Sequence, residues 1–232
     1  MIIPEQYTTE EIRTETAKFI TKVYGWMALA LVVTGVIALW TVMHPEMIAN
    51  IVGSKLVFYA LVFGELGCVI YLTSMINRMT AQTAIAAFML YAVLNGLTLS
   101  ILFLIYTADS LASTFFVTAG TFGAMSAYGY FTKKDLTSMG NLAMMALIGV
   151  IIASVVNMFL QNSTLSWITS CLGVLIFVGL TAYDTQKLKN INVVGLEGTE
   201  EEKKLSIIGA LTLYLDFINL FILLLRFFGR RK

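Results

Sequence analysis

One stretch near the end of the chain decides its fold. Residues 206–228 read SIIGALTLYLDFINLFILLLRFF. An α-helix needs about 20 predominantly apolar residues to cross the hydrocarbon core of a bilayer. This stretch meets that length and carries one acidic residue, Asp216, near its centre. The sequence therefore predicts a membrane-spanning helix with a carboxyl group at mid-depth.

The rest of the chain follows the same pattern. Of its 232 residues, 58% are hydrophobic and 12% are charged, and the mean hydropathy is +0.83. A soluble domain carries roughly 25% charged residues. We predict an all-α membrane protein, a seven-transmembrane-helix bundle with spans at about 23–43, 56–76, 82–106, 111–131, 141–160, 165–186 and 206–228.

Composition disfavours several functional classes. The net charge of +1 provides no basic patch for nucleic acid. His44 is the only histidine, so the sequence contains no cluster of metal ligands, and we expect neither a bound metal nor a cofactor. Cys68 and Cys171 lie inside apolar runs, and we interpret them as small buried side chains rather than a redox pair.

The chain ends suggest an orientation. Residues 1–22 mix acids with bases and lead into a full-length apolar span, so we interpret them as a cytoplasmic segment ahead of a single transmembrane domain, 23–232, rather than as a cleavable signal peptide. Cytoplasmic loops carry an excess of Lys and Arg. With the N-terminus inside, that side holds Arg13, Lys18, Lys22, Arg78, Lys133, Lys134, Lys187, Lys189, Lys203 and Lys204.

The basic tail at 226–232 resists placement on the outer side. Seven full spans are the favoured interpretation. The alternative is a last segment that dips into the membrane and returns, which leaves both termini inside.

Three carboxyl groups lie where lipid disfavours charge. Glu65 is in the middle of the second span, Asp216 in the middle of the seventh, and Asp184 near the cytoplasmic end of the sixth. A charged group at membrane depth is costly unless it is protonated, partnered or hydrated, so each is a candidate functional residue. For Glu65, between Gly64 and Gly67, hydrogen bonding at a close helix contact is an equal alternative.

A polar stripe runs along the seventh span. Gly209, Thr212, Asp216 and Asn219 follow one another at spacings of three, four and three, which places them on one helix face. We expect this stripe to face a partner helix or a pore. The antiparallel sixth span brings Asp184 towards Asp216 only if the helices tilt, a vestibule reaches inwards, or the sixth helix ends later than hydropathy indicates.

Other polar groups allow two interpretations each. We expect Tyr91, Asn95 and Thr98 of the third span to form interhelical hydrogen bonds rather than bind ligands. Arg78, just past the second span, marks the inner interface or reaches a cytoplasmic-side carboxylate. The connection at 187–205 contains four glutamates and a capping-box pattern, which predicts either a solvated helix start or a cation-concentrating mouth.

Two motifs resemble the Bax-inhibitor family of membrane proteins. They are AYDTQ at 182–186 and LYLDFINLF at 213–221, the latter continuing into LLR at 224–226. The resemblance covers essentially the whole chain, including the glutamate of the second span, KKDL at 133–136 and the basic tail. The short loops look bacterial, so we expect a multi-pass protein of the bacterial inner membrane.

The resemblance implies a central seventh helix wrapped by the other six and a calcium leak gated by a pH-responsive aspartate pair. Matched to this sequence, the pair is Asp184 and Asp216, and Arg78 is the candidate for the arginine that can break it. Two carboxyls within hydrogen-bonding reach in a low-dielectric site share a proton and titrate together. The ion pathway or its polar support is expected at Glu65, Asn95, Thr212 and Asn219.

Two other functions are open. Bacterial members are linked to a membrane-bound quality-control protease, so a non-transporting protein that binds and restrains such a protease is the main alternative. Intramembrane aspartyl proteases also place two aspartates on their sixth and seventh spans. They carry glycines before the second aspartate, where this chain has Leu213, Tyr214 and Leu215, so we do not predict an enzyme.

Overall fold

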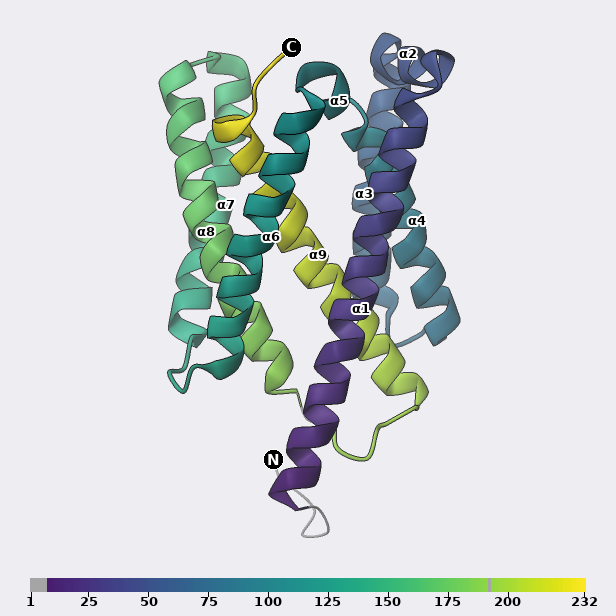
Figure 1. Ribbon diagram of the computed structural model, residues 1–232, viewed down its shortest axis with the longest axis vertical. Helices are drawn as coiled ribbons and strands as arrows, with labels where there is room; N and C mark the ends of the chain where they lie inside the picture. Colours follow the sequence, from purple (N-terminus) through teal and green to yellow (C-terminus); the bar gives the residue numbers. More distant parts are fainter. Residues whose placement is uncertain (1–7, 192) are drawn as a thin grey trace. The chain divides into compact units, whose positions relative to one another are not determined.

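The computed structural model describes residues 8–191 and 193–232, and within these ranges it is helical without a strand (Figure 1). One isolated β-bridge joins Tyr106 and Arg231. The all-α prediction is confirmed. The helices are α1 (Thr9–Val42), α2 (Pro45–Gly53), α3 (Lys55–Met75), α4 (Ala81–Leu99), α5 (Leu102–Ile105), α6 (Ala108–Phe131), α7 (Thr137–Leu160), α8 (Ser163–Lys189) and α9 (Glu200–Phe228).

Six segments among the described residues are long and apolar enough to cross a membrane: α1, α3, α4 with α5, α7, α8 and α9. The fourth predicted span coincides with α6, which has 24 residues but is not among these six. Its serines, threonines and glycines lower its hydropathy. The protein is therefore a multi-pass membrane protein, while the count of seven spans and the central position of the last helix stay predictions.

The chain divides into two compact units. Unit 1 comprises Met1–Ile105 and Ile191–Tyr214, and unit 2 comprises Tyr106–Asn190 and Leu215–Lys232. The boundary falls inside α9, which continues without interruption from Glu200 to Phe228 (Figure 1). The first half of α9 thus belongs to unit 1 and its second half to unit 2.

In unit 1, α4 packs against both α1 and α3. Gly96 permits the close approach of α1, because a Cβ there would lie 2.7 Å from the carbonyl oxygen of Thr34. The first half of α9 joins this core through Tyr214, whose ring makes edge contacts with Phe88 and Tyr91. Close backbone approach at small residues is typical of helix packing in membranes.

In unit 2, α8 packs against both α6 and α7. The second half of α9 contacts α6 through Phe217, whose ring centroid lies 5.5 Å from that of Phe122. It also joins an apolar cluster with α8 that contains Phe177, Leu180 and Leu220. These contacts hold α6, α8 and α9 together around the residues predicted to form the site.

The C-terminal tail docks onto the start of α6. The Thr107 N–H donates to the Arg230 carbonyl oxygen at 3.1 Å, and the Arg230 N–H donates to Ser110 Oγ at 2.8 Å. The 29 residues of α9 extend about 43 Å at 1.5 Å per residue. An unbroken helix of this length favours a full crossing over a segment that dips in and returns.

Candidate functional site

The structure brings Asp184 and Asp216 together in unit 2, from α8 and the second half of α9. Both are buried, with 7% and 5% of their surface exposed, and their carboxyl groups interact by a side-chain hydrogen bond and by charge. The contact is possible because α8 continues to Lys189, three residues past the predicted end. Of the three ways in which Asp184 could reach Asp216, the structure therefore contains the later end of the sixth helix.

One carboxyl oxygen of this pair lacks any hydrogen-bond partner outside the pair. Asp216 Oδ2 is buried and, apart from the facing Asp184 carboxyl group, has no partner among the described residues. An unsatisfied buried polar atom costs about 1–3 kcal/mol, and more if it is charged. Two adjacent carboxyl groups in such surroundings hold one proton between them more readily than two charges. The pair is thus a candidate for proton or cation binding.

The end of α8 also fixes the loop that precedes α7. Gln186 accepts a hydrogen bond from the Leu136 N–H at 2.8 Å, and its amide donates to the Lys134 carbonyl oxygen at 2.7 Å. Lys189 donates to the Tyr130 carbonyl oxygen at 2.6 Å. Lys187, three residues after Asp184, is a positive charge that interacts with that carboxyl group. The sequence places Gln186 in the AYDTQ motif and Lys187 among the cytoplasmic basic residues, but it predicts neither of these contacts.

Two glycines hold α8 close to its neighbours beside Asp184. A Cβ at Gly129 of α6 would collide with the Ala182 carbonyl group, and a Cβ at Gly140 of α7 would collide with the Tyr183 ring. Such contacts leave little freedom for the turn of α8 that carries the aspartate. Sequence reasoning missed them because the contact partners lie more than 40 residues away along the chain.

The other members of the predicted polar stripe turn back onto their own helix. Thr212 donates to the Ile208 carbonyl oxygen at 3.1 Å, and Asn219 donates to the Leu215 carbonyl oxygen at 2.8 Å. Thr212 belongs to unit 1 and Asn219 to unit 2. Asp216 is therefore the stripe residue whose polar side chain contacts another helix of the same unit.

Glu65 forms a separate polar cluster in unit 1. Thr98 Oγ1 donates to Glu65 Oε1 at 2.5 Å, and the Asn95 side chain also hydrogen-bonds to this carboxyl group. Asn95 lies 3.4 Å from the Tyr91 hydroxyl, while its own Oδ1 is buried without a partner in the described chain. The expected interhelical bond between the second and third predicted spans is therefore present, and an ion-pathway role for Glu65 stays a prediction.

Arg78 lies in the turn between α3 and α4, in unit 1, with an exposed side chain. The aspartate pair lies in unit 2. The suggested role of Arg78 as partner of the pair stays a prediction.

Contacts within unit 1 use most of the glutamates of the α8–α9 connection. Lys18 pairs with Glu197 at 3.0 Å, Lys22 pairs with Glu202 at 2.6 Å, and Glu200 accepts the Ala81 N–H at 2.8 Å. Thr199 caps α9 by accepting the Glu202 N–H, as the capping-box pattern predicts. These contacts favour a capped helix start over a cation-concentrating mouth.

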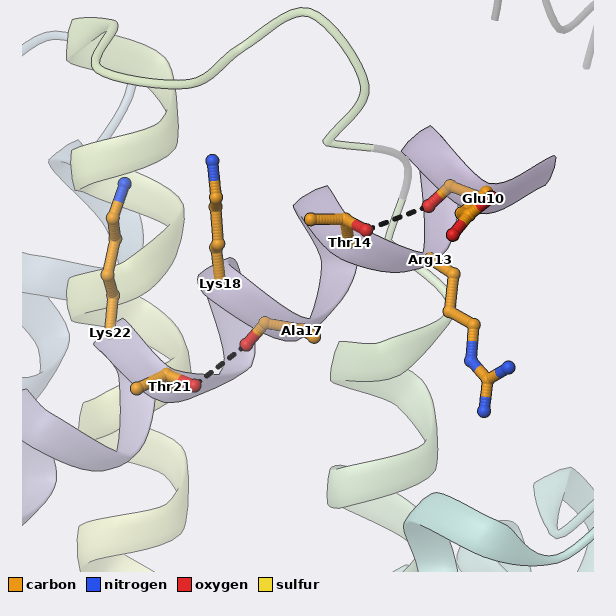
Figure 2. Close-up of a pocket in the computed structure, with 7 residues that line it drawn as sticks. All are labelled: Glu10, Arg13, Thr14, Ala17, Lys18, Thr21 and Lys22. Carbon is orange, nitrogen blue, oxygen red and sulfur yellow. Dashed lines mark hydrogen bonds between the residues drawn. The ribbon is translucent and has the colours of Figure 1, made fainter. Parts of the chain in front are cut away.

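Lys18 and Lys22 point the same way from α1, whereas Arg13 points away from them (Figure 2). The three basic residues lie beside an open surface hollow whose lining contains seven residues of α1. Thr14 and Thr21 donate to the carbonyl oxygens of Glu10 and Ala17 on the same helix. The two lysines, but not Arg13, thus anchor the connection to α1.

The described residues contain no group of three or more His, Cys, Asp and Glu side chains placed to hold a metal ion. Cys68 and Cys171 are half-buried free thiols in different units. The aspartate pair is therefore the candidate site with the clearest geometry.

Comparisons with known proteins agree with the motifs. The family model described as "Inhibitor of apoptosis-promoting Bax1" matches residues 16–232. The inner membrane protein YbhL of Escherichia coli (strain K12) is 48% identical over 215 residues, which cover 92% of each chain. An uncharacterised protein of Borreliella burgdorferi is 44% identical over 215 residues, or 93% of each chain. The chain belongs to the Bax inhibitor family of membrane proteins.

Proposed function

We propose that the protein is a pH-sensitive calcium-leak channel of the bacterial inner membrane, controlled by Asp184 and Asp216. The observation that carries the proposal is the buried contact of these two carboxyl groups, in which Asp216 Oδ2 has no partner other than the facing carboxyl group. A shared proton joins α8 to α9 by a hydrogen bond. Loss of that proton replaces the bond with repulsion between two charges, so the pair is a proton-operated latch between the helices.

Membership in the family supports a location in the membrane but does not identify what the protein transports or binds. The YbhL relative is named an inner membrane protein, which supports the same location here. We further propose a cytoplasmic N-terminus, on the Lys and Arg asymmetry of the loops. Arg78 is proposed as the residue that binds one carboxylate when the pair separates.

Calcium flux into liposomes that contain only the purified protein tests the proposal. We expect flux that changes with pH in the wild type and that loses its pH dependence in Asp216→Asn. Asp109→Asn is the control, because Asp109 is an exposed carboxylate at the start of α6 in the same unit. Absence of flux from well-folded wild-type protein across pH would overturn the channel and favour the regulator of a membrane protease.

A further inference from the structure

A row of hydroxyl groups on α6 has no part in the proposed latch. Ser110, Thr114, Thr118 and Ser126 recur at spacings of four or eight residues, and 5%, 1%, 0% and 7% of their respective surfaces are exposed. Residues four apart are neighbours on a helix surface, so these residues form a row that winds gradually around α6. We call this row the hydroxyl face of α6. It is buried along its length.

Two groups of the hydroxyl face lack hydrogen-bond partners. Thr118 Oγ1 donates to the Thr114 carbonyl oxygen at 2.8 Å, which is the common arrangement for a hydroxyl in a membrane helix. Thr114 Oγ1 and Ser126 Oγ have no partner among the described residues, and Asp216 Oδ2, also in unit 2, has none apart from the facing Asp184 carboxyl group. Buried polar atoms without protein partners are commonly satisfied by water.

Contacts along α6 define the depth of each group within unit 2. The order of these contacts shows that α6 and the second half of α9 run in opposite directions. These contacts are Ser110 with the Phe228 carbonyl oxygen and Phe122 with Phe217. Further along α6, Gly129 contacts Ala182 of α8, two residues before Asp184.

The unpartnered atoms therefore follow one another along the helices. Phe217 directly follows Asp216, and its ring centroid lies 5.4 Å from that of Phe115 and 5.5 Å from that of Phe122, so Asp216 lies between the levels of these two residues on α6. Thr114 lies two turns from Phe122 towards the tail. Ser126 lies one turn beyond Phe122, about 6 Å at 1.5 Å per residue, in the direction of Asp184.

We propose that the hydroxyl face of α6 lines a hydrated cation path, in which Thr114 and Ser126 supply oxygen contacts on either side of Asp216. The identity of the permeant ion rests on the proposed function. Hard cations such as calcium prefer oxygen ligands, including water. The same face explains why α6 is less apolar than the six segments that are long and apolar enough to cross a membrane.

Cysteine accessibility tests hydration without relying on transport. Thr114→Cys and Ser126→Cys are made in a Cys68→Ser, Cys171→Ser background and treated in liposomes with a small, charged, water-soluble methanethiosulfonate. Phe116→Cys is the control, because Phe116 is 73% exposed on an apolar side of α6. We expect labelling at least tenfold faster at 114 and 126 than at 116. Equal or slower labelling at both positions overturns the hydrated face.

Calcium flux then tests the lining role. Thr114→Val and Ser126→Ala should each reduce flux about tenfold while keeping the pH profile, because the aspartate pair is intact. Thr121→Val is the matched control, since Thr121 donates to the Val117 carbonyl oxygen of its own helix and is not fully buried. Thermal unfolding checks that each variant is folded, and labelling decides the matter for any variant that is not.

The two proposals fail differently. Fast labelling at 114 and 126 without calcium flux in the wild type overturns the channel and leaves the hydrated face. If the wild type conducts calcium but labelling at 114 and 126 is slow, the channel stands and this lining is overturned. The same conclusion follows if Thr114→Val and Ser126→Ala leave the flux unchanged.

Discussion

Thr34 and Tyr214 are joined by a hydrogen bond whose donor can be assigned. Their hydroxyl oxygens are 2.6 Å apart, and Thr34 Oγ1 also donates to the Ala92 carbonyl oxygen at 2.9 Å. A threonine hydroxyl has one hydrogen to donate, so Tyr214 is the donor to Thr34. This relay fixes α9 against α1 and α4 within unit 1, two residues before Asp216.

Tyr214→Phe should destabilise the protein modestly. The change removes one buried hydrogen bond and keeps the aromatic contacts, so we expect a loss of about 1 kcal/mol in the free energy of unfolding. Thermal unfolding in detergent micelles measures it. Tyr59→Phe is the control, because Tyr59 is 56% exposed and its change should have no effect. Equal midpoints for both variants would contradict the relay.

Gly129→Ala should lower the free energy of unfolding, although it adds only one methyl group. The new methyl group meets the Ala182 carbonyl group, and overpacking of this kind costs about 1–3 kcal/mol. Gly123→Ala on the same helix meets nothing within 4 Å and should be neutral or stabilising, since alanine is the better helix former. The difference between their unfolding midpoints is the measurement. A midpoint for Gly129→Ala at or above that of Gly123→Ala would show that α8 can move aside.

The sequence alone predicts the helices because they depend on local pattern, whereas the pairing of Asp184 with Asp216 is implied by the resemblance to the Bax-inhibitor family. Apolar length predicts seven spans, of which six are long and apolar enough in the structure to cross a membrane. Helical spacing places Asp216 on a polar stripe of α9. The contact with Asp184 needed one further fact, the continuation of α8 to Lys189, which the sequence left open as one of three alternatives.

Other features depend on contacts between distant residues. The need for glycine at position 129 comes from its contact with Ala182. No local sequence pattern identifies that partner. The hydroxyl face of α6 does have a signal, the spacing of four from Ser110 to Thr118, but Phe122 interrupts it before Ser126. The division of α9 between two units follows from tertiary packing and has no counterpart in its hydropathy.

Glu65→Gln should fold like the wild type. The amide oxygen of the glutamine can still accept the hydrogen bond from Thr98, so the partly buried side chain keeps this partner. Thr98→Val removes that donor and should cost about 1–3 kcal/mol by leaving the Glu65 carboxyl group with Asn95 as its remaining partner. Thermal unfolding of both variants tests this contrast. Calcium flux of Glu65→Gln then separates the two roles, since unchanged flux with intact folding makes Glu65 a structural residue.

Asp184 and Asp216 should behave as one titrating unit. If they share a proton, Asp184→Asn and Asp216→Asn each remove the same pH-dependent step in calcium flux. The double variant should then change the profile little more than either single variant, because contacting residues are not additive. Flux across pH at equal reconstitution measures all three. Additive effects would mean that the two carboxyl groups titrate independently, and a wild-type profile in both single variants would reduce the pair to a packing contact.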